Sequence, residues 1–237
     1  MFTNKIYLKS KEEVAAGTLK LVFNKPANFN FIAGQYVLFG IEQNDKPIAR
    51  SLTIASAPFE DHLEFIVRLS DSDFKQAVNK LKVGDEAYIG NAIGNLILGD
   101  NADSIVFLAG GIGITPFISI LRQAEHDKSR KSFTLFYSNR AEDTSVDLVD
   151  LKSMGIQNYK TVFTLTDANK NVWLGETGRI NKAMLLKYLP QLSAHTYYIV
   201  GTPSFVNAMV EILESSQVPK SQIRTEQFSG YKNAGTS

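Results

Sequence analysis

The order of apolar and polar residues divides the chain into two parts with different periodicity. Up to about residue 100, short apolar runs, several of them alternating with polar residues, are interrupted by glycine and proline. The expected elements here are strands over Thr18–Phe23, Tyr36–Ile41, Leu52–Ala55 and Leu63–Leu69, and one helix over Phe74–Leu81 with Asp73 as its N-cap. Closely spaced short strands predict an antiparallel Greek-key β-barrel over residues 1–100.

After residue 100, apolar strands alternate with amphipathic helices. The expected strands are Ser104–Leu108, Ser132–Tyr137, Thr161–Leu165, Thr196–Val200 and Gln222–Phe228. The expected helices are Pro116–Glu125, Ser145–Met154, Ile180–Tyr188 and Ser204–Glu214. This alternation predicts a doubly wound α/β domain with a parallel sheet over residues 101–237.

Composition narrows the function classes. Hydrophobic residues make up 44% of the chain and charged residues 21%, which is typical of a globular protein. Lysine and arginine number 25 against 24 aspartates and glutamates, so the net charge of +1 provides no overall field for nucleic acid or an anionic membrane. A local patch can still bind a phosphate.

Cysteine and histidine usage excludes further chemistry. The chain has no cysteine, which rules out disulfides, thiolate zinc sites, cysteine nucleophiles and cysteine-ligated iron–sulfur clusters within it. Its three histidines are widely separated, so no metal site is predicted. The first residues lack the apolar core of a signal peptide, and no apolar run approaches the ~20 residues of a membrane span. A cytoplasmic protein is therefore expected.

Residues 50–53 combine groups suited to an elongated ligand. Arg50 is expected to open a strand, and its planar guanidinium can make two parallel hydrogen bonds to a phosphate. Thr53 offers a hydroxyl and a backbone amide suited to a ring nitrogen that gains and loses a hydrogen. An ordinary edge strand with one arginine is the alternative interpretation.

This segment carries a resemblance to a known family. Residues 50–56 (RSLTIAS) resemble the Arg-x-Tyr-Ser/Thr-x-x-Ser flavin motif of the ferredoxin–NADP reductase family. Residues 31–36 and 90–94 are similar to its Phe-x-Pro-Gly-Gln-Phe/Tyr and Gly-Pro-x-Gly turns. The resemblance implies that the flavin phosphate is held by Arg50 and that flavin N5 lies near Thr53. Ser51 and Leu52 would be further flavin contacts.

Two departures from the family pattern matter for flavin binding. Leu52 stands where the family usually has tyrosine, and Phe74 stands where many members place a serine after a glycine-rich turn. The backbone at the start of the expected helix, including Lys75 and Gln76, is predicted to meet the cofactor's phosphates, although two aspartates lie beside it. FAD is the expected cofactor, and FMN stays open.

The clearest local signal follows the first apolar strand of the second half. Three glycines, Gly110, Gly111 and Gly113, precede Thr115 as expected N-cap and Pro116 in the first helical turn. Glycines let backbone amides approach an anion at a helix start, although the order is not the G-x-G-x-x-G fingerprint. It matches the Gly-Gly-x-Gly-x-Thr-Pro of the same family, which implies NAD(P)H pyrophosphate near the loop and nicotinamide near the threonine. A tight turn that needs glycine only for packing is the alternative.

The coenzyme's ribose is expected at the end of the next strand. Ser138 and Arg140 there suit a 2′-phosphate and favour NADPH, whereas Glu142 and Asp143 nearby oppose it and favour NADH. A solvated turn is equally compatible with these residues. The electron donor is therefore left as NAD(P)H.

Two later segments complete the resemblance. Gly201 and Thr202 lie in the place of the family's Cys-Gly-Pro-Pro segment beside the nicotinamide, but Val200 replaces the cysteine, so no thiol can contribute. The end of the chain resembles the family ending Glu-x-Phe, which implies that Phe228 shields the flavin and Glu226 organises the nicotinamide site. A last strand with a frayed tail is the alternative.

Taken together, the resemblance implies hydride transfer from NAD(P)H to bound FAD, with Thr53, Glu226 and Phe228 as the catalytic group. Electrons would pass to a separate acceptor such as ferredoxin, flavodoxin or another redox protein, because the chain has neither cysteines for an iron–sulfur cluster nor length for a haem domain. Two alternatives stay open: an NAD(P)H-dependent free-flavin or quinone reductase, and a non-catalytic nucleotide-binding subunit.

Overall fold

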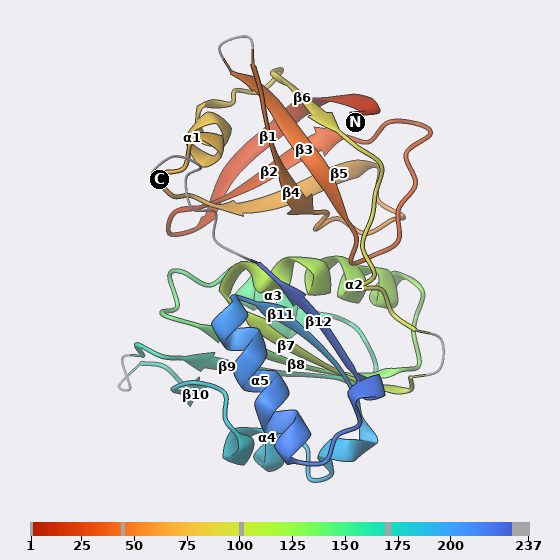
Figure 1. Cartoon of the computed structure of the whole chain (residues 1–237), viewed down its shortest axis with the longest axis vertical. Helices are drawn as coiled ribbons and strands as arrows, with labels where there is room; N and C mark the ends of the chain where they lie inside the picture. Colours follow the sequence, from red (N-terminus) through yellow and green to blue (C-terminus); the bar gives the residue numbers. More distant parts are fainter. Residues whose placement is uncertain (1, 44–45, 100–101, 169–171, 229–237) are drawn as a thin grey trace, which may run out of the picture.

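A computed structural model describes residues 2–43, 46–99, 102–168 and 172–228 and contains two six-stranded sheets, one above the other (Figure 1). The sheet from the first half of the chain is antiparallel and the sheet from the second half is parallel, so the predicted fold class is confirmed. The predicted domain boundary between residues 100 and 101 lies outside the described residues. Among the described residues, no helix combines the length and the apolar character needed to cross a membrane.

The first sheet closes into a barrel. Its strands are β1 (Asn4–Ala15), β2 (Thr18–Asn24), β3 (Tyr36–Gln43), β4 (Lys46–Thr53), β5 (His62–Arg68) and β6 (Glu86–Ile89). Their order is β4-β3-β6-β1-β2-β5, with every pair antiparallel. The two outer strands, β4 and β5, meet just beyond the end of β4, where the Ala55 amide donates a 2.8 Å hydrogen bond to the Glu64 carbonyl.

The barrel core is aromatic. Phe23, Phe39 and Phe65 come from three strands and contact one another edge to face, with ring centroids 5.1 to 6.0 Å apart. Helix α1 (Asp73–Lys80) adds Phe74, which lies 6.2 Å from Phe39 and is 2% exposed. Phe74 is therefore a core residue. The helix begins one residue earlier than predicted, with Ser72 and not Asp73 at the N-cap.

The sequence prediction missed two barrel strands and displaced a third. β1 and β6 were not predicted, because β1 carries many exposed polar residues and β6 has only four residues. β4 covers Lys46–Thr53 instead of Leu52–Ala55. Arg50 therefore lies inside this strand and does not open it.

The second sheet has the predicted doubly wound arrangement. Its strands are β7 (Ser104–Gly110), β8 (Ser132–Asn139), β9 (Tyr159–Leu165), β10 (Glu176–Thr177), β11 (Thr196–Gly201) and β12 (Ile223–Gln227). The order is β10-β9-β8-β7-β11-β12, all parallel. The chain runs outward from β7 to β10 and then returns to β11 beside β7. A crevice is expected where the direction of winding reverses, outside the carboxyl ends of β7 and β11.

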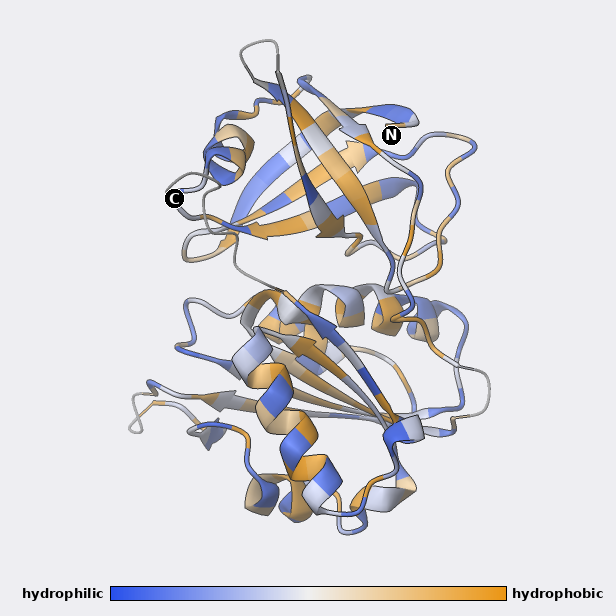
Figure 2. Ribbon diagram, in the orientation of Figure 1, coloured by the Kyte–Doolittle hydropathy of each residue, from blue (hydrophilic) through white to orange (hydrophobic). Residues whose placement is uncertain are grey.

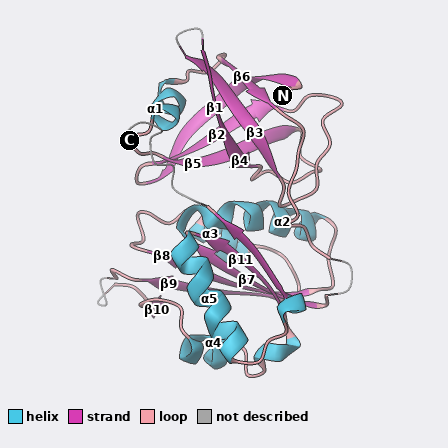
Figure 3. Ribbon diagram, viewed as in Figure 1, coloured by secondary structure: helices cyan, strands magenta, loops and turns pink. Residues whose placement is uncertain are grey.

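Helices cover both faces of this sheet, as Figure 3 shows. They are α2 (Thr115–His126), α3 (Leu148–Ser153), α4 (Lys182–Tyr188) and α5 (Pro203–Ser215). Alternate residues of β7 face opposite layers: Phe107 stacks on Phe117 of α2 at 4.4 Å, while Val106 and Leu108 pack in the cluster that contains α4 and α5. Apolar and polar residues alternate along α5 in Figure 2, because only one side of it faces the sheet.

Helix α2 lies between the parallel sheet and the barrel (Figure 1). A single apolar cluster joins Ala55 and Ile66 of the barrel to Ile120 of α2 and to Phe107 of the sheet. The two sheets therefore pack against each other through this helix.

Candidate active site

Two cavities meet between the barrel and the parallel sheet. The barrel-side cavity has a volume of about 650 Å³ and lies among the ends of β4, β5, α1 and β12. The strand-end cavity has about 520 Å³ and lies at the carboxyl ends of β7, β8 and β11. Arg68, Ile112 and Phe228 line both. Each volume is in the range of small-molecule sites.

The end of β4 forms one wall of the barrel-side cavity. Ser51, Leu52 and Thr53 all line it, as predicted for a bound cofactor, and Thr53 is 8% exposed. β4 is an outer strand of its sheet, so backbone groups as well as side chains are available along its free edge. After Thr53 the chain turns away, held by the Ile54 amide, which donates to the Gln35 carbonyl at 3.1 Å.

Arg50 and Gln76 lie outside both cavities. Arg50 Nη1 donates to the Ala49 carbonyl at 2.7 Å, and the Gln76 side-chain amide donates to the Asp71 carbonyl at 3.2 Å. Neither is among the lining residues. Their contacts with a cofactor stay predictions. Lys75, the third cofactor residue predicted near these, does line the barrel-side cavity.

Three cationic residues line the barrel-side cavity, namely Arg224 and the neighbouring pair Lys75 and Arg68; the two cations of the pair influence each other. Burial lowers the pKa of Lys75, and the nearby charge of Arg68 lowers it further. Arg68 is held in place by hydrogen bonds from Nη2 to the Thr144 carbonyl at 2.5 Å and from Nε to Thr18 Oγ1 at 3.4 Å. A bound phosphate would relieve the repulsion between the two cations, so these residues fit the diphosphate of a flavin nucleotide.

Sequence reasoning missed Arg68. It ends an apolar run, and an arginine at a strand end has no pattern that separates a ligand contact from a solvated side chain. Only the packing of β5 beside the 141–147 loop brings it between the cavities.

The last strand contributes the outer wall. Glu226 of β12 lines the barrel-side cavity, where burial raises its pKa to about 7. The Phe228 amide donates to the Gly201 carbonyl at 2.8 Å, which holds this residue at the junction of the cavities. The sequence prediction placed Phe228 on the flavin and Glu226 at the nicotinamide site; both residues line the barrel-side cavity, and their roles stay predictions.

The glycines of the strand-end cavity allow close backbone packing. Gly110 and Gly201 line it from adjacent strands, and a Cβ atom on either would lie within 3.0 Å of the Phe205 ring. Gly111 also lines it, with φ of +55°. Gly113 lines neither cavity, and its Cβ would lie 2.4 Å from the Val200 carbonyl oxygen. Its position requires glycine for packing, and its predicted coenzyme contact stays a prediction.

The predicted N-cap at Thr115 is wrong. Residues 111–114 form a 3₁₀ turn that continues directly into α2, so Ile114 occupies the cap position and already has helical backbone angles. Thr115 is the first residue of α2, and its Oγ1 donates to the Ile112 carbonyl at 3.1 Å. Thr115 also lines the barrel-side cavity, whereas Gly110 and Gly111 line the strand-end cavity. Pro116 lies in the first turn, as expected.

The remaining predicted coenzyme residues gather at the strand-end cavity. Ser138, Arg140 and Thr202 line it. The Thr202 hydroxyl caps α5 by accepting from the Phe205 amide at 3.3 Å. Arg140 Nε lies 3.6 Å from Asp167 Oδ2 in an exposed ion pair.

The charged residues that line the strand-end cavity are all arginines. Arg68, Arg140 and Arg179 line it, and no carboxylate is among its lining residues in the described part of the chain. Arg179 was not predicted, because it lies in the loop before α4, where no sequence pattern distinguishes a ligand contact from a solvated side chain. Three guanidinium groups suit a ligand with several phosphates.

Comparison with known protein families finds two domain models in succession. The oxidoreductase FAD-binding domain matches residues 5–97, and the oxidoreductase NAD-binding domain matches residues 107–211. The first range covers the barrel except for Asn4 at the start of β1, and the second contains the loop of Gly110, Gly111 and Gly113.

Curated relatives are longer than this chain. The glycine betaine monooxygenase reductase subunit of Chromohalobacter salexigens is 24% identical over 219 residues, which cover 89% of this chain and 60% of the relative. The propane 2-monooxygenase reductase component of Mycolicibacterium goodii is 25% identical over 224 residues, covering 89% and 63%. The chain thus spans less than two thirds of the length of either relative.

Solved structures share the fold. A ferredoxin NADP⁺ reductase from Neisseria gonorrhoeae with bound FAD and NADP superimposes with a TM-score of 0.83 at 22% identity, covering 96% of this chain and 98% of that one. An Amycolatopsis cytochrome P450 reductase gives a TM-score of 0.83 at 20% identity, covering 96% and 70%.

Proposed function

Because the chain belongs to the ferredoxin–NADP reductase-like oxidoreductases, which join an FAD-binding domain to an NAD-binding domain, we propose that it transfers a hydride from NAD(P)H to bound FAD and passes the electrons to a separate acceptor. One observation carries this proposal: the barrel-side and strand-end cavities share Arg68, Ile112 and Phe228 as a common wall. Two ligands in these cavities would meet at that wall. A flavin supplies the chemistry of two-electron uptake from a hydride donor.

Residues of the chain would bind and orient the two ligands. Lys75 and Arg68 would bind the flavin diphosphate, and Thr53 and Thr115 would face the reacting ends of the ligands from opposite domains. Phe228 would cover the junction and exclude water, since it lines both cavities. Glu226 would hold or release a proton near neutral pH, because burial raises its pKa to about 7.

The lining residues favour NADPH over NADH. Ser138 and Arg140 line the strand-end cavity, whereas Glu142 and Asp143, which would repel a 2′-phosphate, do not. Arg179 adds a third guanidinium. We therefore expect the 2′-phosphate to add affinity.

The acceptor would be a separate redox protein. The relatives from Chromohalobacter salexigens and Mycolicibacterium goodii are named as reductase components of monooxygenases, which supports an oxygenase component as one class of acceptor. The cytoplasmic location expected from the sequence stays a prediction.

An anaerobic titration tests this function. The protein is saturated with FAD, freed of unbound flavin by gel filtration, and titrated with NADPH and NADH while flavin absorbance is recorded. We expect retained FAD and bleaching at about one equivalent of NADPH. Retained FAD that neither coenzyme bleaches would indicate a non-catalytic nucleotide-binding subunit. Loss of FAD on the column, with turnover of added flavin, would indicate a free-flavin reductase.

A further inference from the structure

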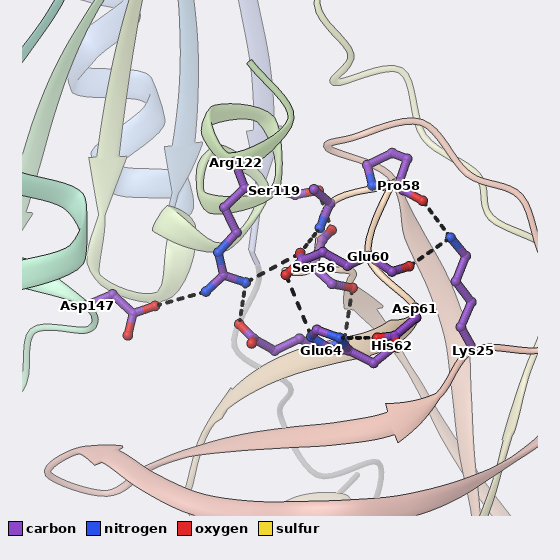
Figure 4. Close-up of polar contacts among 11 residues, drawn as sticks. Lys25, Ser56, Pro58, Glu60, Asp61, His62, Glu64, Ser119, Arg122 and Asp147 are labelled. Atoms are coloured by element: carbon purple, nitrogen blue, oxygen red, sulfur yellow. Dashed lines mark hydrogen bonds and ion pairs between the residues drawn. The ribbon is translucent and has the colours of Figure 1, made fainter. Parts of the chain in front are cut away.

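A polar network crosses the contact between α2 and the barrel (Figure 4). Arg122 lies at its centre. Arg122 Nη1 lies 3.1 Å from Glu64 Oε1 and 3.8 Å from Glu60 Oε2, and Nη2 lies 4.0 Å from Asp147 Oδ2. Glu60 and Glu64 belong to the barrel, whereas Asp147 belongs to the parallel-sheet domain. One guanidinium therefore connects carboxylates from both domains.

The network is mostly shielded from water. The side chains of Glu64 and Asp147 are 6% and 10% exposed, and Arg122 is 22% exposed. Burial raises the pKa of both carboxyl groups, and Arg122 is the strongest influence opposing that rise, ahead of Lys20. Without Arg122, three carboxylates from two domains would face one another across the contact.

Two neighbours of Arg122 hold the same barrel segment. Ser119, Arg122 and His126 follow at spacings of three and four residues, so they share one face of α2. Ser119 Oγ donates to the Ser56 carbonyl at 2.6 Å, and the His126 ring stacks on Phe59 with centroids 3.9 Å apart. The segment 56–64 is thereby clamped along the helix.

Each segment that Arg122 joins leads to a cavity wall. The clamped barrel segment follows Thr53, which lines the barrel-side cavity. α2 begins at Thr115, beside the glycine loop, and the loop containing Asp147 follows Arg140 of the strand-end cavity. Arg122 itself is not among the lining residues of either cavity.

We propose that Arg122 is a positioning residue that fixes the barrel-side cavity relative to the strand-end cavity through Glu64, Glu60 and Asp147. The structural part of this proposal is independent of the proposed function, and only the expected effect on hydride transfer rests on it. The rate of that step depends steeply on how the two ligands are placed, so a small displacement between the domains lowers the rate far more than it weakens the binding of either ligand.

The kinetic test separates rate from binding. Arg122→Ala, Arg122→Lys and the control Lys187→Ala, which breaks an exposed ion pair with Glu176 far from the contact, are compared by anaerobic stopped flow at saturating NADPH. For Arg122→Ala we expect a rate of flavin bleaching lowered about 10- to 100-fold, with dissociation constants for FAD and NADPH within about threefold of the parent. Arg122→Lys should recover most of the rate. An unchanged rate for Arg122→Ala, or binding losses that account for the whole decrease, would overturn the proposal.

A distance measurement provides a readout that does not need activity. The chain has no cysteine, so Lys9→Cys on the barrel and Glu211→Cys on α5 give two unique spin-label sites. Both positions are exposed. We expect one narrow distance distribution in the parent, a broadened or shifted one with Arg122→Ala, and recovery with Arg122→Lys. An unchanged distribution with Arg122→Ala would contradict the positioning role, whether or not the flavin can be reduced.

Glu64→Gln covers the case in which Arg122→Ala does not fold. It removes the nearest carboxylate while keeping the shape of the side chain, and it leaves Arg122 paired with the other two carboxylates. The same changes in rate and distance, smaller in size, are expected. Their absence would again overturn the proposal. Failure of the parent protein to bleach its flavin would count against the proposed function alone.

Discussion

The barrel-side cavity and the strand-end cavity share three lining residues but are built differently. The strand-end cavity is formed where parallel strands end on the same edge of a sheet, so Gly110 and Gly201 come together as a consequence of topology. The barrel-side cavity is formed where antiparallel strands, a short helix and the last strand of the other domain meet. In the parallel sheet, short motifs at the strand ends are therefore enough to indicate where the cavity lies. The position of the barrel-side cavity depends on how the barrel closes and on how the other domain packs against it.

The two cavities also differ in whether side chains or the lack of them shape the ligand site. At two positions the strand-end cavity depends on the absence of a side chain, because an added Cβ atom at Gly110 or Gly201 would meet Phe205. The barrel-side cavity depends on side chains, chiefly Arg68 and Lys75. Substitutions should therefore damage the two sites by different mechanisms.

The largest effect is expected from Gly113→Ala. The added Cβ would lie 2.4 Å from the Val200 carbonyl oxygen, a backbone atom in a packed core that cannot easily move aside. We therefore expect a loss of about 2–3 kcal/mol in the free energy of unfolding. Denaturant unfolding measures it. Gly99→Ala is the matched control, because no atom lies within 4 Å of its added Cβ. Equal stability of the two variants would contradict the packing role.

Arg68→Ala should weaken both sites at once, because Arg68 lines both cavities. Loss of a charged hydrogen-bond donor costs about 1.5–3 kcal/mol, so each dissociation constant, for FAD and for NADPH, should rise about 10- to 100-fold. Isothermal titration of the apoprotein with each ligand measures this. Lys75→Ala should weaken FAD alone. If Arg68→Ala affects only one ligand, the shared wall has no energetic role.

A smaller effect confined to the strand-end cavity is expected from Arg140→Ala. Its ion pair with Asp167 is exposed, so stability should change little. Loss of a guanidinium beside a 2′-phosphate should lower NADPH affinity about tenfold and leave NADH affinity nearly unchanged. Competition binding with the two coenzymes compares them, and a similar loss for both would show that Arg140 does not contact the 2′-phosphate.

The smallest effect concerns Glu226 in the barrel-side cavity. Its pKa is about 7 in the folded chain and 4.5 as the ordinary value, so the folded state binds the proton more tightly. Because the side chain is partly exposed and screened by solvent, stability should fall by only about 1 kcal/mol as pH rises from about 4.5 to about 7, and level off above that. Glu226→Gln should flatten this dependence in chemical denaturation across the same range. A variant with the same slope as the parent would show that the group titrates normally.

Local patterns were enough to predict most elements. Strand–helix alternation after residue 100 is a local property, and each predicted strand and helix there is found with shifted ends. The barrel was harder because its longest strand, β1, has mostly exposed residues. Thr115 looked like an N-cap because its type is common at that position, but the preceding 3₁₀ turn moved the cap to Ile114. No local sequence pattern predicts that a 3₁₀ turn runs directly into the helix.

The site residues likewise fall into those that local patterns predict and those that depend on distant contacts. Gly110, Gly111, Ser138 and Thr202 could be predicted to line one cavity, because they follow apolar strands whose ends meet in any parallel sheet. Arg68 could not, because its place depends on packing against a loop some 76 residues away.

The amino-acid order alone determined two successive folding units, one periodic in strands and one alternating strands with helices, together with the glycine loop at the start of α2. Those features depend on interactions within a few residues. Tertiary structure alone decided that the two cavities share a wall, that Arg68 lies in it and Arg50 does not, and that Arg122 joins carboxylates from both domains. Such placements arise from contacts between segments far apart in the chain, for which side-chain periodicity carries no information.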